Sequence, residues 1–393
     1  KRLPFYKRLA FERNYLKNAI LDCLRAGGGG DESRKGEYHL RLSNWRRELD
    51  YARILHERGI SNLAFKIVRK VKQEAKKYES LHLWKSALFL EERMVYNTLK
   101  GEKGERQALD SVIDEQLKLS RATVEAYELT ALHRQGFSIA ETSAEAEKAQ
   151  RLGELLKHPL LQPDYKPLTV KTTDLRLNIL SNIYSYTQQY EKHYESISLR
   201  AKLFAAHPHL YDAEDRLLLV ARLIRSCMGL GKIKESNEAV KQYFEISPLT
   251  DRGRQNHFAQ SLIYVVPFWI KFQQYEEAIK LASDAYDFLG KGGGYLNGLT
   301  KHDVYHSYLQ LFIITEKYDK ALDWFHLQQQ ETVAPGTEGD FLRGQLCAII
   351  AHFELGNSGV VTSMCRAIQR TLKDQPFLVN TERVFTRFIQ KIP

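Results

Sequence analysis

Few side chains in this sequence have the types and spacing that catalysis or metal binding requires. His302 and His306 lie four residues apart, with Asp303 between them. On a helix this spacing puts both imidazoles on one face, where they could bind a metal ion. No third ligand is evident in the sequence, so we do not expect a metal site at this pair. His207 and His209 flank a proline, which indicates a turn between helices rather than a metal pair.

Glycine-rich stretches at positions 27–30 and 290–294 could suggest phosphate cradles. Neither has the GxxxxGK[ST] pattern or follows a strand-like segment, so both are interpreted as loops. The sequence also contains no HExxH and no GxSxG motif. We therefore predict no catalytic site, no metal and no cofactor, and a binding protein rather than an enzyme.

The positive charge of the chain is concentrated at one end. The formal net charge is +10, and residues 1–100 hold 23 Lys and Arg against 12 Asp and Glu, whereas the rest holds 35 against 36. The basic residues that we expect outside the apolar stripe of one helix are Lys66, Arg69, Lys70, Lys72, Lys76 and Lys77. This basic face is either a solvated surface or an electrostatic footprint for an acidic protein or nucleic acid. No helix-turn-helix, zinc finger or RNA-binding aromatic motif accompanies it.

The four cysteines, Cys23, Cys227, Cys347 and Cys365, are far apart and form no CxxC motif. We expect reduced thiols, mostly packed in helical cores, in a cytoplasmic protein. No apolar run approaches the roughly 18 residues that span a bilayer, so no membrane association is expected.

Helical periodicity dominates the chain. In residues 64–78, AFKIVRKVKQEAKKY, the apolar positions Ala64, Ile67, Val68, Val71 and Ala75 fall in one stripe of a helix. No sustained alternation of period two is bounded by hairpin signals. The sequence therefore predicts an all-α protein.

A short pattern, a polar turn followed by Tyr-x-x-Ala, recurs along the chain. It is clearest at Tyr275–Ala278 and Tyr318–Ala321, and looser copies end at positions 64, 193, 236 and 361. The last five of these anchors are spaced by 43, 42, 43 and 40 residues, and the early gap from 64 to 193 is three times 43. Two hidden copies are therefore expected near 107 and 150. Self-similarity at such a period is the signature of stacked helical hairpins, each with a small anchor where its two helices meet.

These copies resemble tetratricopeptide repeats. In the copy anchored at Ala278, the matching positions are Leu262, Val265, Trp269, Phe272, Tyr275 and Ala285, and in the next copy they are Tyr305, Tyr308, Phe312, Tyr318 and Phe325. The usual tetratricopeptide period is about 34 residues, whereas the period here is about 42. The small residue expected midway along the first helix is replaced by Ile224, Val266, Leu309 and Ile349. The N-terminal part also resembles uncharacterised bacterial helical-repeat proteins.

The resemblance implies a right-handed, TPR-like α-solenoid of about eight helical hairpins. We expect a basic helical-repeat region at 1–158, a TPR-like region at 172–373 and a capping helix at 374–393. Pro267 lies within a helical pattern and should kink that helix, because proline lacks a backbone donor and crowds the preceding turn.

The resemblance also implies a function. In such repeats the first helix of each hairpin lines a concave groove that binds a protein or an extended peptide. The groove positions implied by the alignment are Asn178, Asn182, Arg225, Gln260, Asp303, His306, Gln310 and Arg343. We predict a protein- or peptide-binding scaffold, and the alternatives are an ordinary solvated face or a nucleic-acid-binding protein that uses the basic face. The sequence does not identify the partner.

Overall fold

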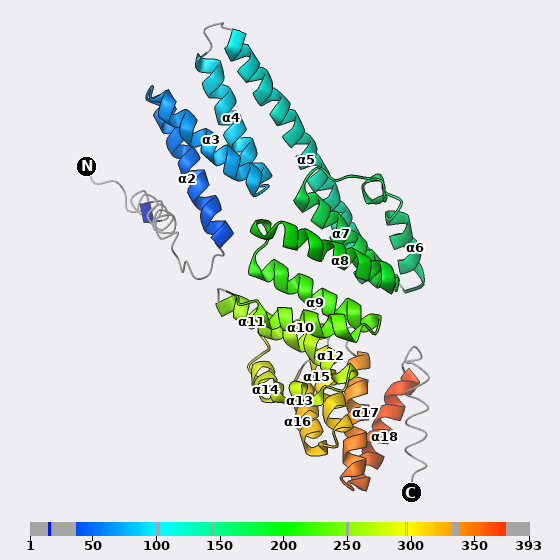
Figure 1. The fold of residues 1–393 in the computed structure, drawn as a ribbon. Coiled ribbons are helices and arrows are strands. Elements are labelled where there is room, and N and C mark those ends of the chain that lie inside the picture. The colour runs from blue at the N-terminus through cyan, green and yellow to red at the C-terminus, as the bar shows by residue number, and fades with distance from the viewer. Residues whose placement is uncertain are drawn as a thin grey trace, which may run out of the picture. The chain divides into compact units, whose positions relative to one another are not determined.

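The computed structural model describes residues 15–16, 37–98, 103–142, 145–248, 251–294, 296, 298–331 and 338–374. Within these ranges the chain is helical and contains no strand. Helices that follow one another in the sequence pack side by side as hairpins (Figure 1). The prediction of an all-α, repeat-like architecture is confirmed.

Contacts group the chain into two units. The N-terminal unit comprises Lys1–Leu219 and Glu245–Arg254, and the C-terminal unit comprises Val220–Phe244 and Gln255–Pro393. The division falls within the helix α9, Ala213–Gly229. The Pro-rich segment 159–171 lies inside the N-terminal unit, and the division at residue 158 stays a prediction.

The N-terminal unit is a succession of helices that pack around several local cores. Its helices are α2 (Glu37–Glu57), α3 (Ser61–Lys77), α4 (Leu81–Thr98), α5 (Lys103–Thr142), α6 (Glu145–Leu155), α7 (Val170–Tyr186) and α8 (Tyr190–Ala206), with short 3₁₀ turns η2 (Pro159–Leu161) and η3 (Pro208–Leu210). One core joins α2, α3 and α4 around Trp45, Val68 and Met94, and another joins α5, α6 and α7 around Leu129 and Ile183. A further one lies between α4 (Leu88) and α5 (Val112 and Leu119).

The C-terminal unit contains part of α9 and α10 (Ile233–Glu245), and the later helices. These are α11 (Asp251–Gln260, from Gln255 on), the segment η4 (Ser261–Val265), α12 (Val266–Lys271), α13 (Tyr275–Lys280), α14 (Ala282–Gly290), α15 (Gly298–Ile314), α16 (Tyr318–Gln329), α17 (Glu338–Glu354) and α18 (Ser358–Asp374). Its core is rich in aromatic rings: Trp324 stacks on Tyr308 with centroids 4.2 Å apart and meets Tyr305 at 6.4 Å.

Among the described residues, seven turns between consecutive helices share one backbone motif. In each, a residue with positive φ lies two positions before the next helix; these residues are Gly59, Glu79, Gln188, Gly231, Gln273, Glu316 and Gly356. The N–H that follows each of them donates to a carbonyl five residues earlier at 2.7–2.9 Å, as Gln274 does to Trp269. This is the Schellman end of a helix, which satisfies carbonyls that would otherwise lack partners.

The predicted anchors lie where the helices restart. Helices begin at Ser61, Tyr190, Ile233, Tyr275, Tyr318 and Ser358, three residues before the anchors at 64, 193, 236, 278, 321 and 361. Ala64, Ser236, Ala278 and Ala321 have no exposed surface. The predicted turn positions are thus confirmed, and the small anchors lie in close helix contacts.

Helix α5 is longer than the repeat pattern leads one to expect. Hairpins around 107 and 150 would suggest separate helices, but Lys103–Thr142 is one helix of 40 residues. No glycine or proline occurs between Glu105 and Gln135, so nothing in the sequence terminates the helix there.

Pro267 is accommodated by a change of helix type. Ser261–Val265 forms a π-helical turn, in which the N–H of Val266 donates to the carbonyl of Ser261. A π turn just before a proline absorbs the lost donor without ending the helix. The helix therefore changes type at Pro267, and the predicted kink stays a prediction.

Several expectations concern other parts of the chain. Cys227, Cys347 and Cys365 are free thiols, and burial raises the pKa of the Cys347 thiol to about 11. Cys23, the first glycine-rich stretch and most of the proposed capping helix 374–393 lie outside the described residues. Among the described helices, none contains an apolar stretch long enough to cross a bilayer.

Candidate partner-binding surfaces

The C-terminal unit displays several of the predicted groove residues at its surface. Asp303 and Gln310 are exposed and His306 is half-buried, and their spacing puts all three on one face of α15. Gln310 Nε2 lies 2.9 Å from His306 Nε2, within hydrogen-bond distance. Arg225 on α9 and Arg343 on α17 are also exposed. The α15 row therefore presents amide, imidazole and carboxylate groups along about two turns of helix.

Gln260 has a less open position. It is the last residue of α11 and directly precedes the π turn. Its side chain is half-buried, and within the described part of the chain no group hydrogen-bonds its Oε1 atom. The oxygen is buried, so in this structure it is not presented to a partner outside the chain.

In the N-terminal unit the two predicted groove asparagines take part in internal contacts. Asn178 and Asn182 on α7 both lie near His133 Nε2 of α5, at 3.3 and 3.4 Å. Asn178 Oδ1 also accepts a hydrogen bond from Arg200 Nη1 at 3.0 Å. Arg200 is buried and forms a two-pronged ion pair with Asp174, at 2.7 and 3.3 Å. These asparagines therefore link α5, α7 and α8, a role the sequence reasoning missed.

The eight groove residues are divided between the two units. Their union in one concave surface stays a prediction. The structure brings Asp303, His306 and Gln310 together on α15 in the C-terminal unit. In the N-terminal unit it brings Asn178 and Asn182 of α7 together beside His133.

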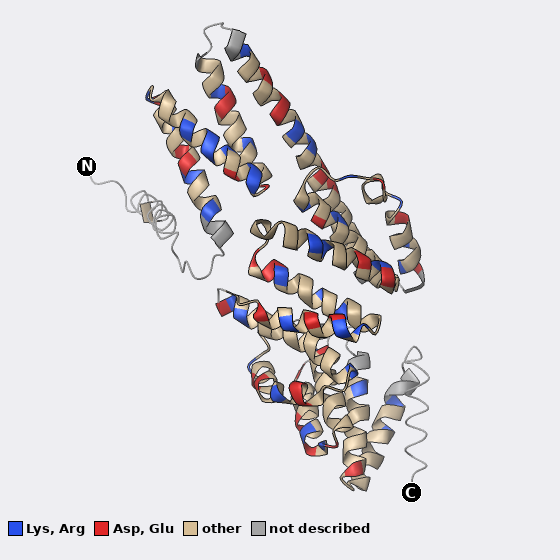
Figure 2. Ribbon diagram, in the orientation of Figure 1, with Lys and Arg blue, Asp and Glu red and all other residues tan. Residues whose placement is uncertain are grey.

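Much of the basic face on α3 forms ion pairs with carboxylates of neighbouring helices. Lys70 pairs with Glu48 of α2 at 3.0 Å, and Lys76 pairs with Glu115 of α5 at 2.6 Å. Arg69 lies 4.0 Å from Glu91 of α4. Figure 2 shows blue and red segments interspersed along α2, α3, α4 and α5. Lys66 and Lys77 are exposed at the surface.

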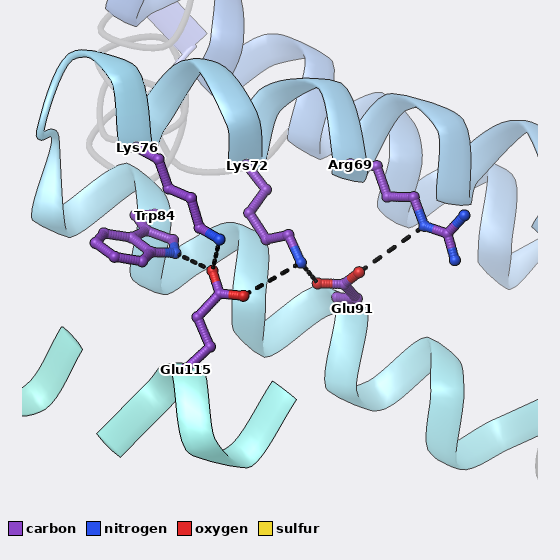
Figure 3. A network of polar contacts seen from close by, with 6 residues as sticks. All are labelled: Arg69, Lys72, Lys76, Trp84, Glu91 and Glu115. Atoms are coloured by element: carbon purple, nitrogen blue, oxygen red, sulfur yellow. Dashed lines mark hydrogen bonds and ion pairs between the residues drawn. The ribbon is translucent and has the colours of Figure 1, made fainter. Parts of the chain in front are cut away.

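Lys72 is at the centre of this network and is not part of a solvated face. Its Nζ lies 2.5 Å from Glu91 Oε2 and 3.5 Å from Glu115 Oε2 (Figure 3). The Lys72 side chain is only 15% exposed. The expectation that Lys72 lies outside the packed side of α3 is therefore wrong, because carboxylates from α4 and α5 extend to that side.

Glu115 also accepts a hydrogen bond from Trp84 Nε1 at 2.6 Å. Burial alone would raise the pKa of Glu115, but the hydrogen bonds from Lys76 and Trp84 and the charge of Lys72 outweigh burial and hold this pKa below its ordinary value. The network thus joins α3, α4 and α5 through buried charge.

A cleft of about 680 Å³ adjoins this network in the N-terminal unit. Its walls include Trp84, Asp110, Asp114, Glu79 and Leu168. The Glu79 carboxylate is already engaged, since it accepts the N–H groups of Val170 and Lys171 at the start of α7. Sequence reasoning did not indicate this cleft, because its walls come from helices far apart in the chain.

The histidines singled out in the sequence have structural partners. His302 is buried, and its Nδ1 lies 3.3 Å from Gln328 Nε2. His209 Nε2 lies 3.0 Å from the carbonyl oxygen of Lys77. Across the described ranges, no group of three or more His, Cys, Asp or Glu side chains is arranged to hold a metal ion.

No family model matches the chain, and no curated protein matches it.

Proposed function

We propose that this chain is a protein- or peptide-binding scaffold rather than an enzyme. In this proposal the hairpins form a right-handed, TPR-like solenoid of about eight units with a period of about 42 residues. The groove is lined by the first helix of each hairpin. The partner is a protein or an extended peptide, and the free thiols Cys227, Cys347 and Cys365 suit a reducing compartment such as the cytoplasm.

The observation that carries the proposal is the row of polar side chains on α15. Asp303, His306 and Gln310 lie on one helix face, and Asp303 and Gln310 are exposed. The contact between Gln310 and His306 orients the amide. An extended peptide presents a repeated N–H and C=O pattern, which amides match because they donate and accept.

Arg225 on α9 and Arg343 on α17 add exposed guanidinium groups on the first helices of two other hairpins. A guanidinium group is suited to capture a carboxylate in two-pronged geometry. The expected partner segment therefore carries an acidic side chain or a C-terminal carboxylate.

The nucleic-acid alternative has less support. Arg69, Lys70 and Lys76 lie beside carboxylates of the same unit, which reduces the charge available to phosphates. Lys66 and Lys77 remain as exposed candidates on this basic face.

The experiment begins with affinity purification from native lysate and identification by mass spectrometry. Overlapping peptides of each captured protein are then titrated against wild type, Arg225→Ala/Gln310→Ala and Lys66→Glu/Lys77→Glu. We expect the first variant to weaken peptide binding at least tenfold, as hot-spot truncation does, and the second to leave it unchanged. Salt-dependent binding of generic DNA or RNA that only the second variant abolishes would instead establish the alternative.

A further inference from the structure

One side of the α4–α5 pair exposes an unusual number of large apolar side chains. They are Phe89 and Tyr96 on α4 and Ile113, Leu117, Val124 and Tyr127 on α5, with exposed fractions between 40% and 73%. On α5 the spacing i, i+4, i+11 and i+14 puts all four on one helix face. Scattered apolar residues at a surface are ordinary, whereas a contiguous set marks an interaction site. We refer to these six residues as the apolar stripe.

Two hydrogen bonds identify the two sides of the helix pair. On one side Trp84 of α4 donates to Glu115 of α5, and Lys76 of α3 reaches the same carboxylate. On the other side Gln116 of α5 donates to Glu92 of α4 at 2.7 Å. Helix α3 therefore covers the Trp84 side.

The apolar stripe lies on the side that α3 does not cover. On a helical wheel, Phe89 and Tyr96 lie next to Glu92 and away from Trp84. Ile113 and Val124 likewise lie next to Gln116 and away from Glu115. In an antiparallel pair these residues lie on the same side of the two helices as the contact between Glu92 and Gln116.

Basic side chains border the apolar stripe. The exposed residues Lys85 and Arg93 share the face of α4 with Phe89, each one turn away. On α5 three arginines are exposed: Arg121 lies within the length of the stripe, and Arg106 and Arg134 lie beyond its two ends. The acidic residues nearby are Asp110, Asp114, Glu128 and Glu92, of which Glu92 is hydrogen-bonded. The border therefore holds five basic side chains against four acidic ones, a net positive charge of one.

We propose that this apolar surface binds an amphipathic helix of a partner protein whose apolar face is flanked by acidic residues. From Ile113 to Tyr127 the stripe is about 21 Å long at 1.5 Å per residue, which matches about four turns of a partner helix. Apolar contacts along the stripe supply affinity, and complementary charge at the border supplies specificity and orientation. This surface is separate from the groove proposed above and does not depend on it.

Other occupants fit the surface less well. The N-terminal segment 1–26 holds seven Lys and Arg against two acidic residues, so its charge has the same sign as the border. A lipid surface would bring Glu92 and Gln116 towards hydrocarbon, where polar groups are costly to place. A protein helix can instead hydrogen-bond these two side chains.

The test uses the full chain and two synthetic probes. The first is a fluorescein-labelled 18-residue amphipathic peptide with Leu on one face and Glu beside it, and the matched peptide carries Lys in place of every Glu. Fluorescence anisotropy measures both against wild type, Phe89→Ser/Val124→Ser and Arg93→Glu/Arg121→Glu. Tyr51→Ser/Leu199→Ser is the control, because it removes equally exposed apolar groups elsewhere in the same unit. Circular dichroism verifies that every variant is folded.

We expect the acidic peptide to bind wild type at least tenfold more tightly than the Lys peptide. The serine variant should weaken this binding at least tenfold, the glutamate variant should abolish the preference for acid, and the control should match wild type. The proposal is overturned if neither peptide binds, or if the serine variant binds normally. It is also overturned if the serine variant instead abolishes dimerisation in sedimentation or binding to phosphatidylglycerol vesicles, since a second copy or a lipid surface would then be the occupant.

Discussion

The carboxylate of Glu79 accepts the backbone N–H of Val170 at 2.8 Å, across 91 positions of sequence. Its other oxygen accepts the N–H of Lys171 at 2.7 Å. Glu79 lies in the turn between α3 and α4 with φ of +46°, a conformation that favours glycine. The turn thus holds the carboxylate at the positive end of α7, where negative charge stabilises a helix.

Replacing Glu79 with Gln should therefore loosen the start of α7. The amide presents one acceptor oxygen instead of two, so one N–H loses its partner, at a cost of about 1–2 kcal/mol. Hydrogen exchange of the amides of Val170 and Lys171 measures this effect directly. Glu316→Gln is the matched control, because Glu316 has the same backbone conformation in another turn and is exposed. Equal exchange in both variants would show that Glu79 does not cap α7.

The shared turn makes a second prediction, about glycine. Gly356 has φ of +76°, and a Cβ added there would meet no atom within 4 Å. Gly356→Ala should still destabilise the C-terminal unit by about 1–2 kcal/mol, because the left-handed conformation itself is unfavourable for alanine. Gly359 lies three residues later, inside α18, and also has open space around it.

Gly359→Ala is the control for Gly356→Ala. It should leave stability unchanged or raise it by up to about 0.5–1 kcal/mol, since alanine favours helix. Urea denaturation followed by circular dichroism compares the two variants. If both shift the midpoint in the same direction and by the same amount, backbone conformation is not the cause.

The turns and the anchors could be predicted from the sequence because both are local. A helical pattern of apolar residues that changes phase after two polar residues indicates a turn. Small residues shortly after the turn, such as the buried Ala278 and Ala321, indicate that another helix packs there. Four of the seven left-handed positions, among them Gln273 and Glu316, are not glycine. Sequence therefore indicated the positions of those turns but not their backbone motif.

The candidate surfaces were less predictable because they depend on pairings between distant helices. The partners of Lys72 and Lys76 come from α4 and α5, and a helical wheel of α3 alone cannot show them. Asn178 was assigned to a groove by alignment, yet His133 of α5 lies within hydrogen-bond distance of it. The apolar stripe on α5 went unnoticed, because a stripe of period 3.6 is usually interpreted as a buried face.

A third prediction concerns the buried contact between Gln328 and Gly344. Gln328 is fully buried, and a Cβ on Gly344 would lie 1.9 Å from its Oε1 atom. Gly344→Ala must displace the amide, which also lies 3.3 Å from His302 Nδ1 through its Nε2 atom. We expect a loss of about 1–3 kcal/mol from overpacking and the disturbed hydrogen bond.

A double-mutant cycle separates this clash from a general effect of alanine at position 344. Gln328→Ala removes the obstructing amide, so the double variant should be more stable than the sum of the two single losses predicts, by at least about 0.5 kcal/mol. Strictly additive losses in urea denaturation would show that the two residues do not compete for this space.

The last prediction concerns acid and the carboxylate of Glu115. The pKa of Glu115 is held below its ordinary value of 4.5 by Lys76, Trp84 and Lys72, despite the opposing effect of burial. A carboxyl group whose pKa is lower in the folded state stabilises the fold at pH values above its unfolded pKa. That contribution is lost as the pH falls through the folded-state pKa. Glu115→Gln should therefore cost about 1–3 kcal/mol at pH 7, and the difference from wild type should shrink below pH 4.5.

Hydrogen exchange of α4 and α5 at pH 7 and at pH 3.5 measures this local stability, after correction for the intrinsic exchange rates. Asp114→Asn is the matched control: it changes a neighbouring, exposed carboxylate and should stay within about 0.5 kcal/mol of wild type at both pH values. A cost for Glu115→Gln that is the same at both pH values would mean that packing, rather than charge, accounts for the effect. A cost that disappears in acid would establish that the carboxylate and the three donors around it stabilise the contacts of α3 with α4 and α5.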